Sequence, residues 1–512
     1  MNNTIRIMLG AVFAVAVAFY ANSIMGQATH GTFLVLAAVF GAYMAMNIGA
    51  NDVANNVGPA VGAKAITIGS AIVIASIFEA AGALIAGGDV VGTIKKDIIS
   101  PDAFGNDPMM FVYAMSAALL AAALWLNLAT WLKAPVSTTH SIVGGVMGAG
   151  IAAGGLAIVS WTTMGTIAAS WVISPVLGGV IAATFLYIIK SQVIYKADRL
   201  SAAKKVVPAL VAIMSAAFIT YLTLKGFKHI WGSIVEIFSF LPQTDKPTFT
   251  VALIFGLIGG VITFFIVKPR VAQKVVGLDN SREAINVLFT IPLIFAAALL
   301  SFAHGANDVA NAVGPLAAVN DALTSLKVST KASIPLWVMV TGGIGISIGL
   351  ALYGPRLIRT VGSEITELDQ MRAFSIMMAA AITVVIASQL GLPVSSTHIA
   401  VGAVFGVGFL REWLDSKGTG AKQKMLQEET EKHHELKAEL AAYAGDDYKK
   451  KVELMEAEKA QKKNVKAIKR ELRENYVKRG LVKKIIAAWL ITVPAAAAVS
   501  AIIFYVLKGL AI

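Results

Sequence analysis

The sequence predicts an all-α polytopic membrane protein of about 12 to 13 transmembrane helices in two inverted repeats, with some helices broken or re-entrant. Three observations lead to this fold class. Hydrophobic residues make up 57% of the 512 positions and charged residues 14%, and the mean hydropathy is +0.72, which leaves too little polar surface for a soluble protein. Apolar runs recur at the length of a membrane span. Two compound motifs each occur twice, once in each half of the chain.

The apolar runs are mostly about 18 to 25 residues long, enough to cross a hydrocarbon core of about 30 Å as helices. The first run is longer than the apolar region of a usual signal peptide, so we expect it to be a retained anchor. In chain order the runs lie at about 5–25, 32–50, 65–88, 109–132, 135–158, 162–190, 207–224, 248–268, 284–303, 331–353, 371–390, 393–412 and 481–511.

These runs and motifs divide the chain into six parts. The charged part near the end is rich in Glu, Lys, Ala and Leu, a composition that favours two solvated helices joined by a turn. In order, we expect an additional N-terminal transmembrane helix at 1–31, a first repeat at 32–190, connecting transmembrane segments at 191–283, a second repeat at 284–412, a charged cytoplasmic helical insert at 413–480 and a C-terminal transmembrane helix at 481–512.

The net charge of +13 would suggest a nucleic-acid partner in a soluble protein. Here the basic residues gather in the insert and in loops between spans, so membrane topology explains them better and no nucleic acid is expected. The positive-inside rule places the loops at 190–205 and 268–282 in the cytoplasm. Counting spans from these loops puts the N-terminus, Arg356 and the insert inside, and the C-terminus outside. The spans that enter the two halves' first motifs then run in opposite directions, as in transporters with inverted repeats.

The first motif is Gly-Ala-Asn-Asp-Val-Ala-Asn-(Asn/Ala)-Val-Gly-Pro, at Gly49–Pro59 and again at Gly305–Pro315. A membrane-embedded Asp costs about 2.5 to 3.5 kcal/mol on insertion scales, so Asp52 and Asp308 each need a cation. Glycines and a proline are expected to break the helix and free backbone carbonyls. Hard oxygen ligands suit Na⁺, and a carboxylate alone could serve H⁺ instead. The alternative is simple helix capping. The amides beside the two carboxylates are Asn51, Asn55, Asn56, Asn307 and Asn311.

The second motif is Pro-Val-Ser-(Thr/Ser)-Thr-His, at Pro135–His140 and Pro393–His398. The Asp to Ser separation between the motifs is 85 residues in the first half and 87 in the second, which indicates a duplicated unit. A proline at the first helical position followed by hydroxyls predicts an anion cradle suited to a tetrahedral oxyanion. N-capping alone is the plainer interpretation. The hydroxyls are those of Ser137, Thr138, Thr139, Ser395, Ser396 and Thr397.

Four further polar side chains interrupt the apolar runs. His140, His398 and His304 are candidates for a supporting role, either in proton relay or as hydrogen-bonded structural residues. Glu79 lies in an apolar helix, and the corresponding stretch of the second half has no acid. Glu79 is therefore a candidate third cation or proton site, or a partner of a nearby polar group. The absence of cysteine excludes disulfides and thiolate sites.

Together these motifs resemble the inorganic phosphate transporter family, the PiT type of sodium- or proton-coupled phosphate permeases that includes the vertebrate type III cotransporters. The resemblance also takes in Ala75-Ser76-Ile77-Phe78-Glu79 and the stretch Ala488–Ala496. It covers about residues 32 to 412 and 481 to 511, leaving out the first span and the charged insert.

The resemblance implies phosphate symport through an all-helical inverted-repeat fold, and a homodimer by analogy. It implies cation-binding positions at Asp52, Asp308, Asn51, Asn307 and Glu79, with sodium at the two Asp residues. Phosphate would contact the six hydroxyls, with Asn55 and Asn311 alongside. Proton-coupled bacterial relatives have His-Asp-Thr-Ala-Asn where this chain has Asn-Asp-Val-Ala-Asn at 51–55, which favours Na⁺.

The function predicted from these observations is secondary active symport of inorganic phosphate with Na⁺ by alternating access, in a multi-pass protein of the cell membrane. No enzymatic activity and no cofactor other than the co-transported Na⁺ are expected. Three alternatives stay open at this point. These are coupling to H⁺ or transport of another oxyanion such as sulfate, an intramembrane aspartyl protease built on Asp52 and Asp308, and a passive channel.

Overall fold

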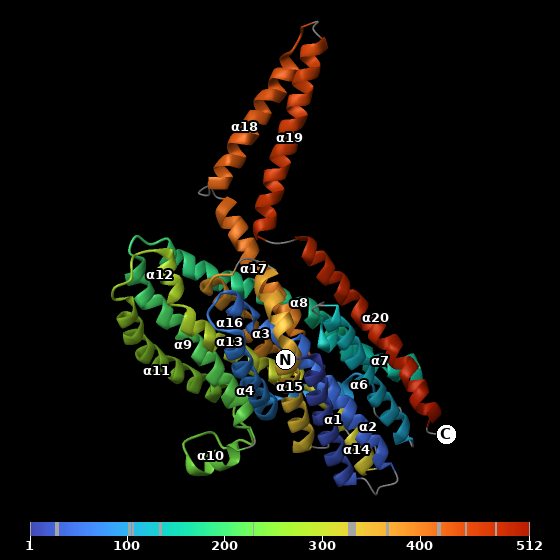
Figure 1. The fold of residues 1–512 in the computed structure, drawn as a ribbon. Coiled ribbons are helices and arrows are strands. Elements are labelled where there is room, and N and C mark those ends of the chain that lie inside the picture. The colour runs from blue at the N-terminus through green and yellow to red at the C-terminus, as the bar shows by residue number, and fades with distance from the viewer. Residues whose placement is uncertain are drawn as a thin grey trace.

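A computed structural model of the chain describes residues 2–25, 30–100, 104, 107–132, 136–228, 230–325, 334–364, 368–416, 421–445, 448–476 and 479–510. Pro135, the first residue of one predicted cradle, lies outside these ranges. The described chain is helical almost throughout, as predicted, and an isolated antiparallel bridge joins Ile99 and Val159. Figure 1 shows a bundle of tilted helices from which one long hairpin projects.

The helices are α1 (Asn3–Met25), α2 (Gly31–Asn51), α3 (Val53–Gly62), α4 (Ile68–Ala86), α5 (Gly88–Gly92), the π-helical turn η1 (Thr93–Asp97), α6 (Pro108–Trp131), α7 (Thr138–Gly154), the 3₁₀ turn η3 (Leu156–Ile158), α8 (Trp161–Ile189), the π-helical turn η4 (Lys190–Ile194), α9 (Arg199–Gly226), α10 (Trp231–Ile237), α11 (Phe249–Val275), α12 (Arg282–Val287), α13 (Thr290–Asp308), α14 (Ala310–Ser325), α15 (Leu336–Glu364), α16 (Gln370–Gln389), α17 (Ser396–Ser416), α18 (Ala421–Ala442), α19 (Tyr448–Tyr476) and α20 (Arg479–Leu510).

Eleven helical segments among the described residues are long and apolar enough to cross a membrane, close to the 12 to 13 predicted. The difference arises largely at the hydroxyl motifs. The predicted runs at 135–158 and 393–412 are the helices α7 and α17, and α7 has only 17 residues. Both begin at a buried hydroxyl motif, so each starts inside the bundle rather than at its surface.

The expected helix breaks at the two Gly-Ala-Asn-Asp motifs are present, but they are short and do not fall at the glycines or prolines. The helical path is interrupted at single residues, Asp52 between α2 and α3 and Val309 between α13 and α14, and both keep right-handed helical dihedrals. Pro59 and Pro315 lie within α3 and α14. Proline has no N–H, so Pro59 leaves the carbonyl of Asn55, and Pro315 that of Asn311, without its usual helical donor. The motifs therefore form local breaks in two long helical segments.

Helix packing is reciprocal between the two halves. α2 packs on α15, and its counterpart α13 packs on α4. In the same way α17 and α16 pack on α8, while α7 and α6 pack on α20. Glycines permit the closest approaches, since a Cβ added at Gly49 would overlap the carbonyl oxygen of Ile346, and one added at Gly305 would overlap that of Glu79. This exchange of partners agrees with a duplicated unit, and the inverted orientation of the repeats stays a prediction.

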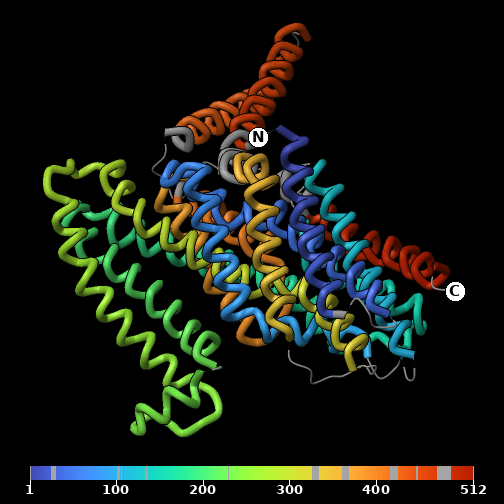
Figure 2. Tube along the Cα trace, turned by 60° about the horizontal axis from the view of Figure 1, so that its bottom comes forward, coloured from blue at the N-terminus to red at the C-terminus, as the bar shows by residue number. Residues whose placement is uncertain are grey.

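Three groups of helices lie outside this duplicated core. α9 and α11 pair with one another at one side of the bundle, with the short α10 between them in sequence (Figure 2). The charged insert forms the two helices predicted for it, α18 and α19, which pack as a hairpin. α1 packs on α2 and α15. The N-terminus lies at the end of the bundle from which the α18–α19 hairpin projects (Figure 2).

Candidate functional site

The carboxylate of Asp52 is held by hydroxyls from both halves of the chain. Its side chain is fully buried at the junction of α2 and α3. Thr138, from the start of α7, donates to Oδ2 at 2.7 Å. Thr397, from the start of α17 in the other half, donates to Oδ1 at 2.8 Å. Asp52 therefore lies where the two hydroxyl motifs meet, as the duplicated sequence pattern predicted.

Asp308 shares one of these hydroxyls. Its Oδ2 lies 3.0 Å from the same Thr138 Oγ1. A hydroxyl has one hydrogen, so Thr138 can donate to only one of the two carboxylates at a time. The Oδ1 atom of Asp308 is buried and has no hydrogen-bond partner among the described residues. Asp308 is thus the less satisfied of the two carboxylates.

His304 connects Asp308 to Glu79. Nδ1 of His304 lies 2.8 Å from Glu79 Oε2, and Nε2 lies 3.0 Å from Asp308 Oδ2 without hydrogen-bond alignment. Glu79 also accepts a bond of 2.7 Å from Asn56 Nδ2. Sequence reasoning gave His304 only a supporting role. The signal that could have raised it is its position four residues before Asp308 on one helix, which places both side chains on the same face.

This cluster could hold a cation. Ligand atoms of Asp52, His304 and Asp308 lie within 4.8 Å of one another, and all three residues are buried. Glu79 adds a third buried carboxylate. No Lys or Arg forms an ion pair with these three acids in the part of the chain that the structure describes. The negative charge must therefore be balanced by protons or by bound cations.

The side chains of Asn51 and Asn307 hold the chain around the cluster in matching ways. Asn51 Nδ2 donates to Thr130 Oγ1 at 3.0 Å, and Asn307 Nδ2 donates to Ser388 Oγ at 2.9 Å. Thr130 and Ser388 were missed, although they lie 79 and 81 residues after their amides, a repeat that aligning the two halves would have revealed. Asn307 Oδ1 is buried without a partner among the described residues and is available to a cation.

Asn55 and Asn311 reach across to the opposite half. Asn55 Nδ2 donates to Thr397 Oγ1 at 2.8 Å. Asn311 Nδ2 lies 3.2 Å from Thr138 Oγ1 and 3.3 Å from Thr139 Oγ1. Each amide thereby orients the hydroxyls that the other half contributes. The structure brings the predicted Asp, Asn and Thr side chains together in one buried network.

The six predicted hydroxyls do not have equal surroundings. Ser137 and Ser395 are N-caps, accepting from the backbone N–H of His140 at 3.1 Å and of His398 at 3.2 Å. Thr139 donates to the Val394 carbonyl at 2.8 Å. The other three are Thr138 and Thr397 on the carboxylates, and Ser396, whose Oγ is buried without a partner among the described residues.

One expectation about the cradles is wrong. Pro393 was expected at the first helical position, but α17 begins at Ser396 with Ser395 as its cap, so this proline precedes the cap by two residues. The serine hydroxyl closes the first turn instead. The free N–H groups at the starts of α7 and α17 remain close to the network, because Thr138 is the first residue of α7 and Ser396 of α17.

The histidines that end the two motifs pack against tryptophan rings. His140 lies 3.7 Å from the ring centroid of Trp171, and His398 lies 3.5 Å from that of Trp489. The two histidine rings are 4.4 Å apart, nearly perpendicular. Their side-chain nitrogens have no hydrogen-bond partner among the described residues. Packing against the tryptophan rings therefore helps to hold both histidine side chains.

Comparison with known proteins identifies the family. The profile described as Phosphate transporter family matches residues 48–500. The chain belongs to this family. A Helicobacter pylori J99 protein assigned as a phosphate permease is 49% identical over 99% of this chain and 95% of its own length. One assigned in Pyrococcus horikoshii is 40% identical over 74% of this chain and 89% of its own. A solved structure, "The sodium-dependent phosphate transporter", is 33% identical, with a TM-score of 0.73, and the match covers 93% of this chain and 99% of that one.

Family membership decides between several sequence alternatives. The phosphate transporter family consists of transporters, so the chain is not an enzyme, and the protease interpretation of Asp52 and Asp308 is set aside although the two acids do lie close together. Phosphate transport by an integral multi-pass membrane protein is the function that the family supports.

Proposed function

We propose that this transporter carries phosphate together with Na⁺, by alternating access between its two halves. The observation that carries the proposal is the hydroxyl of Thr138 within hydrogen-bond distance of both Asp52 and Asp308. The sodium-dependent phosphate transporter of similar structure supports Na⁺ as the coupling ion. Homodimerisation stays a prediction from family analogy.

The electrostatics favour cation binding. Two carboxylate charges no more than 4.8 Å apart repel one another by at least about 3.5 kcal/mol at an effective dielectric constant of about 20. A phosphate anion brought to the same network would add to this repulsion. Cations at Asp52 and Asp308 would remove it, so each ion improves the binding of the other, and that mutual dependence is thermodynamic coupling.

The phosphate anion would accept hydrogen bonds from donors that have no partner, or only long contacts, within the network. Ser396 Oγ has no partner among the described residues, and the amide of Asn311 makes only long contacts of 3.2 and 3.3 Å to Thr138 and Thr139. The N-termini of α7 and α17 add backbone N–H groups that suit an oxyanion. Ser137, Ser395 and Thr397 complete the proposed phosphate contacts, with Asn55 orienting Thr397.

Proton coupling is the second candidate, and one observation favours it. His304 lies between Glu79 and Asp308 at 2.8 and 3.0 Å, so a proton could pass along a chain of three titratable groups. In that case His304→Gln should abolish uptake driven by a pH gradient. Uptake driven by Na⁺ should survive the same substitution if Na⁺ itself occupies the carboxylates.

The test is radiolabelled phosphate uptake into proteoliposomes under an imposed Na⁺ gradient, an imposed H⁺ gradient or neither. We expect uphill uptake with Na⁺, lost in Asp52→Asn and in Asp308→Asn. Asp279→Asn is the matched control. Asp279 is exposed, and the substitution removes a single carboxylate at a position outside the network. Uptake with H⁺ alone would transfer the coupling role to protons. Phosphate movement that never exceeds its own gradient would indicate a passive channel.

A further inference from the structure

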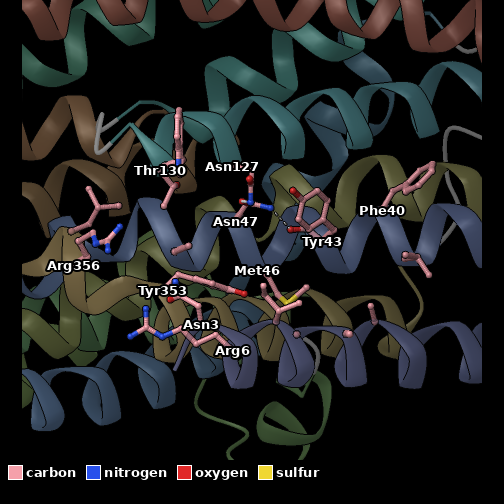
Figure 3. Close-up of a pocket in the computed structure, with 18 of the residues that line it drawn as sticks. Asn3, Arg6, Phe40, Tyr43, Met46, Asn47, Asn127, Thr130, Tyr353 and Arg356 are labelled. Carbon is pink, nitrogen blue, oxygen red and sulfur yellow. Dashed lines mark hydrogen bonds between the residues drawn. The ribbon is translucent and has the colours of Figure 1, made fainter. Parts of the chain in front are cut away.

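A cavity with several polar side chains in its lining lies beside the central network, between α1, α2, α6 and α15. Its volume is about 630 Å³. Figure 3 shows the side chains that each of the four helices contributes to its lining. The polar lining residues that carry the argument are Arg6 on α1, Asn47 on α2, Asn127 and Thr130 on α6, and Tyr353 and Arg356 on α15.

The charged side chains among the described lining residues of this cavity are both basic. They are the guanidinium groups of Arg6 and Arg356, and no Asp or Glu lines the cavity among the residues that the structure describes. The Nε atom of Arg6 is buried and has no hydrogen-bond partner among the described residues. A buried guanidinium N–H without a partner is costly, and an anion with several oxygens is the group that such a fork binds best.

The cavity is connected to the central network through one amide. Thr130 lines the cavity and accepts the bond of 3.0 Å from Asn51 Nδ2. Asn51 immediately precedes Asp52, and Ala50 before it also lines the cavity. A rotation of the Asn51 side chain away from Thr130 would therefore open the network towards the two arginines.

We propose that this cavity is a binding site for a phosphate group on the cytoplasmic path out of the transporter, with Arg6 and Arg356 as its anion-binding residues. The inference rests on the proposed transport cycle. The end of the bundle that carries the N-terminus also carries the α18–α19 hairpin (Figure 2), and the positive-inside pattern predicts that end to be cytoplasmic. Phosphate released from the network would meet the two guanidinium groups before it reaches water.

The additional N-terminal helix α1 contributes Arg6 and the outer wall of this cavity. Residue 6 lies before the part of the chain that matches the family profile, which begins at 48. α1 is largely exposed along its length, and Arg6 is among its more buried residues. The same guanidinium chemistry would hold the phosphodiester of a lipid headgroup, because the outer wall of the cavity is formed by a peripheral helix. The experiment separates these two sources of phosphate.

The experiment compares wild type with Arg6→Gln, Arg356→Gln and the double variant in vesicles of phosphatidylcholine. KM is measured for phosphate efflux from the cytoplasmic face and for uptake from the other face. The ratio of the first to the second should rise about tenfold in the double variant, the size expected when a partly exposed charge-assisted hydrogen bond is lost. Arg359→Gln is the matched control, one turn further along α15 and not part of the lining, and should leave the ratio unchanged.

A lipid arm repeats the measurement with phosphatidylglycerol added. An unchanged KM ratio in phosphatidylcholine, together with a phosphatidylglycerol effect that the double variant abolishes, would assign the site to a lipid headgroup. An unchanged ratio and an unchanged lipid response would overturn the inference. Efflux down a phosphate gradient needs no Na⁺ gradient, so the comparison still reports on the cavity if wild-type uptake proves not to be driven by Na⁺. Failure of the proposed coupling is thus distinguishable from failure of the site.

Discussion

Gly305→Ala should separate α13 from α4 at the point where Glu79 meets His304. The Cβ of the new alanine would overlap the backbone carbonyl oxygen of Glu79. A backbone atom cannot rotate away as a flexible side chain can, so the two helices must move apart by about 1 Å to restore van der Waals contact. Glu79 Oε2 and His304 Nδ1, now 2.8 Å apart, lie on the two helices that separate.

The energetic cost of this substitution can be compared with a control. Overpacking at a helix interface costs about 1 to 3 kcal/mol. Replacing Gly by Ala in a helix also contributes about 1 kcal/mol of stability through the backbone. Gly165→Ala on α8 has the same backbone gain, and no heavy atom lies within 4 Å of its added Cβ. The free energies of unfolding of the two variants should therefore differ by about 1 to 3 kcal/mol, with Gly305→Ala the less stable.

The assay is thermal unfolding of both purified variants, paired with phosphate uptake at varied Na⁺. A displacement of about 1 Å at a binding site can lower a rate by about 100-fold, so uptake by Gly305→Ala should fall steeply while that by Gly165→Ala stays near wild type. Gly82→Ala, which would overlap the Phe302 carbonyl at the same interface, should behave like Gly305→Ala. Wild-type stability and uptake in both interface variants would refute the close approach of α4 and α13.

Two further predictions concern other contacts. Thr138→Val should lower the free energy of unfolding by about 1.5 to 3 kcal/mol, because the lost hydrogen bond has a charged acceptor. Thr139→Val should lower it by only about 0.5 to 1.5 kcal/mol, because its acceptor is a neutral carbonyl. Thermal unfolding should also show that Thr138→Ser keeps the stability of wild type, and equal losses in the two Val variants would contradict this. In the hairpin, hydrogen bonds from Lys432 and Gln461 hold the pKa of Glu429 below its usual value. A lowered pKa gives the folded state a stabilising contribution that is present above the unfolded-state pKa and is lost as pH falls through the folded-state pKa. Glu429→Gln should therefore increase amide exchange in α19 near pH 7, and this difference from wild type should disappear at pH values below the lowered folded-state pKa. The same difference at both pH values would be inconsistent with this linkage.

The main features of the site could be predicted from the sequence because duplication makes them visible twice. An isolated Asp-Asn pair or Ser-Thr pair is ambiguous between capping and binding. Two copies of each motif, with Asp to Ser separations of 85 and 87 residues, indicate that both halves hold these side chains in equivalent positions. The structure brings Asp52, Asp308, Thr138 and Thr397 into direct contact. The helical class followed from the length of the apolar runs, which depends only on bilayer thickness.

The details that sequence reasoning missed depend on contacts across the fold. The pairing of His304 with Glu79 joins residues 225 positions apart, and nothing in either local sequence specifies the other. The expected breaks at the Gly-Ala-Asn-Asp motifs fall at Asp52 and Val309 rather than at the glycines, for a different reason. Glycines there serve the close approach of helices, as at Gly49 and Gly305, so they did not indicate a flexible backbone.

Hydrogen bonds between the two halves give a physical reason why movement of one half against the other would be unfavourable when no ions are bound and the carboxylates are charged. Thr397 of the second half holds Asp52 of the first, and Thr138 of the first half contacts Asp308 of the second. Sliding one half against the other without ions would remove donors from buried carboxylates, each at a cost of about 1 to 3 kcal/mol or more. Cations bound to Asp52 and Asp308 would replace those donors, and phosphate would in turn accept from the released hydroxyls. A transporter built this way would change conformation readily when both ions are bound, or when protons neutralise the carboxylates in the absence of ions, but not with one ion alone. That restriction would couple one ion's gradient to the other's movement.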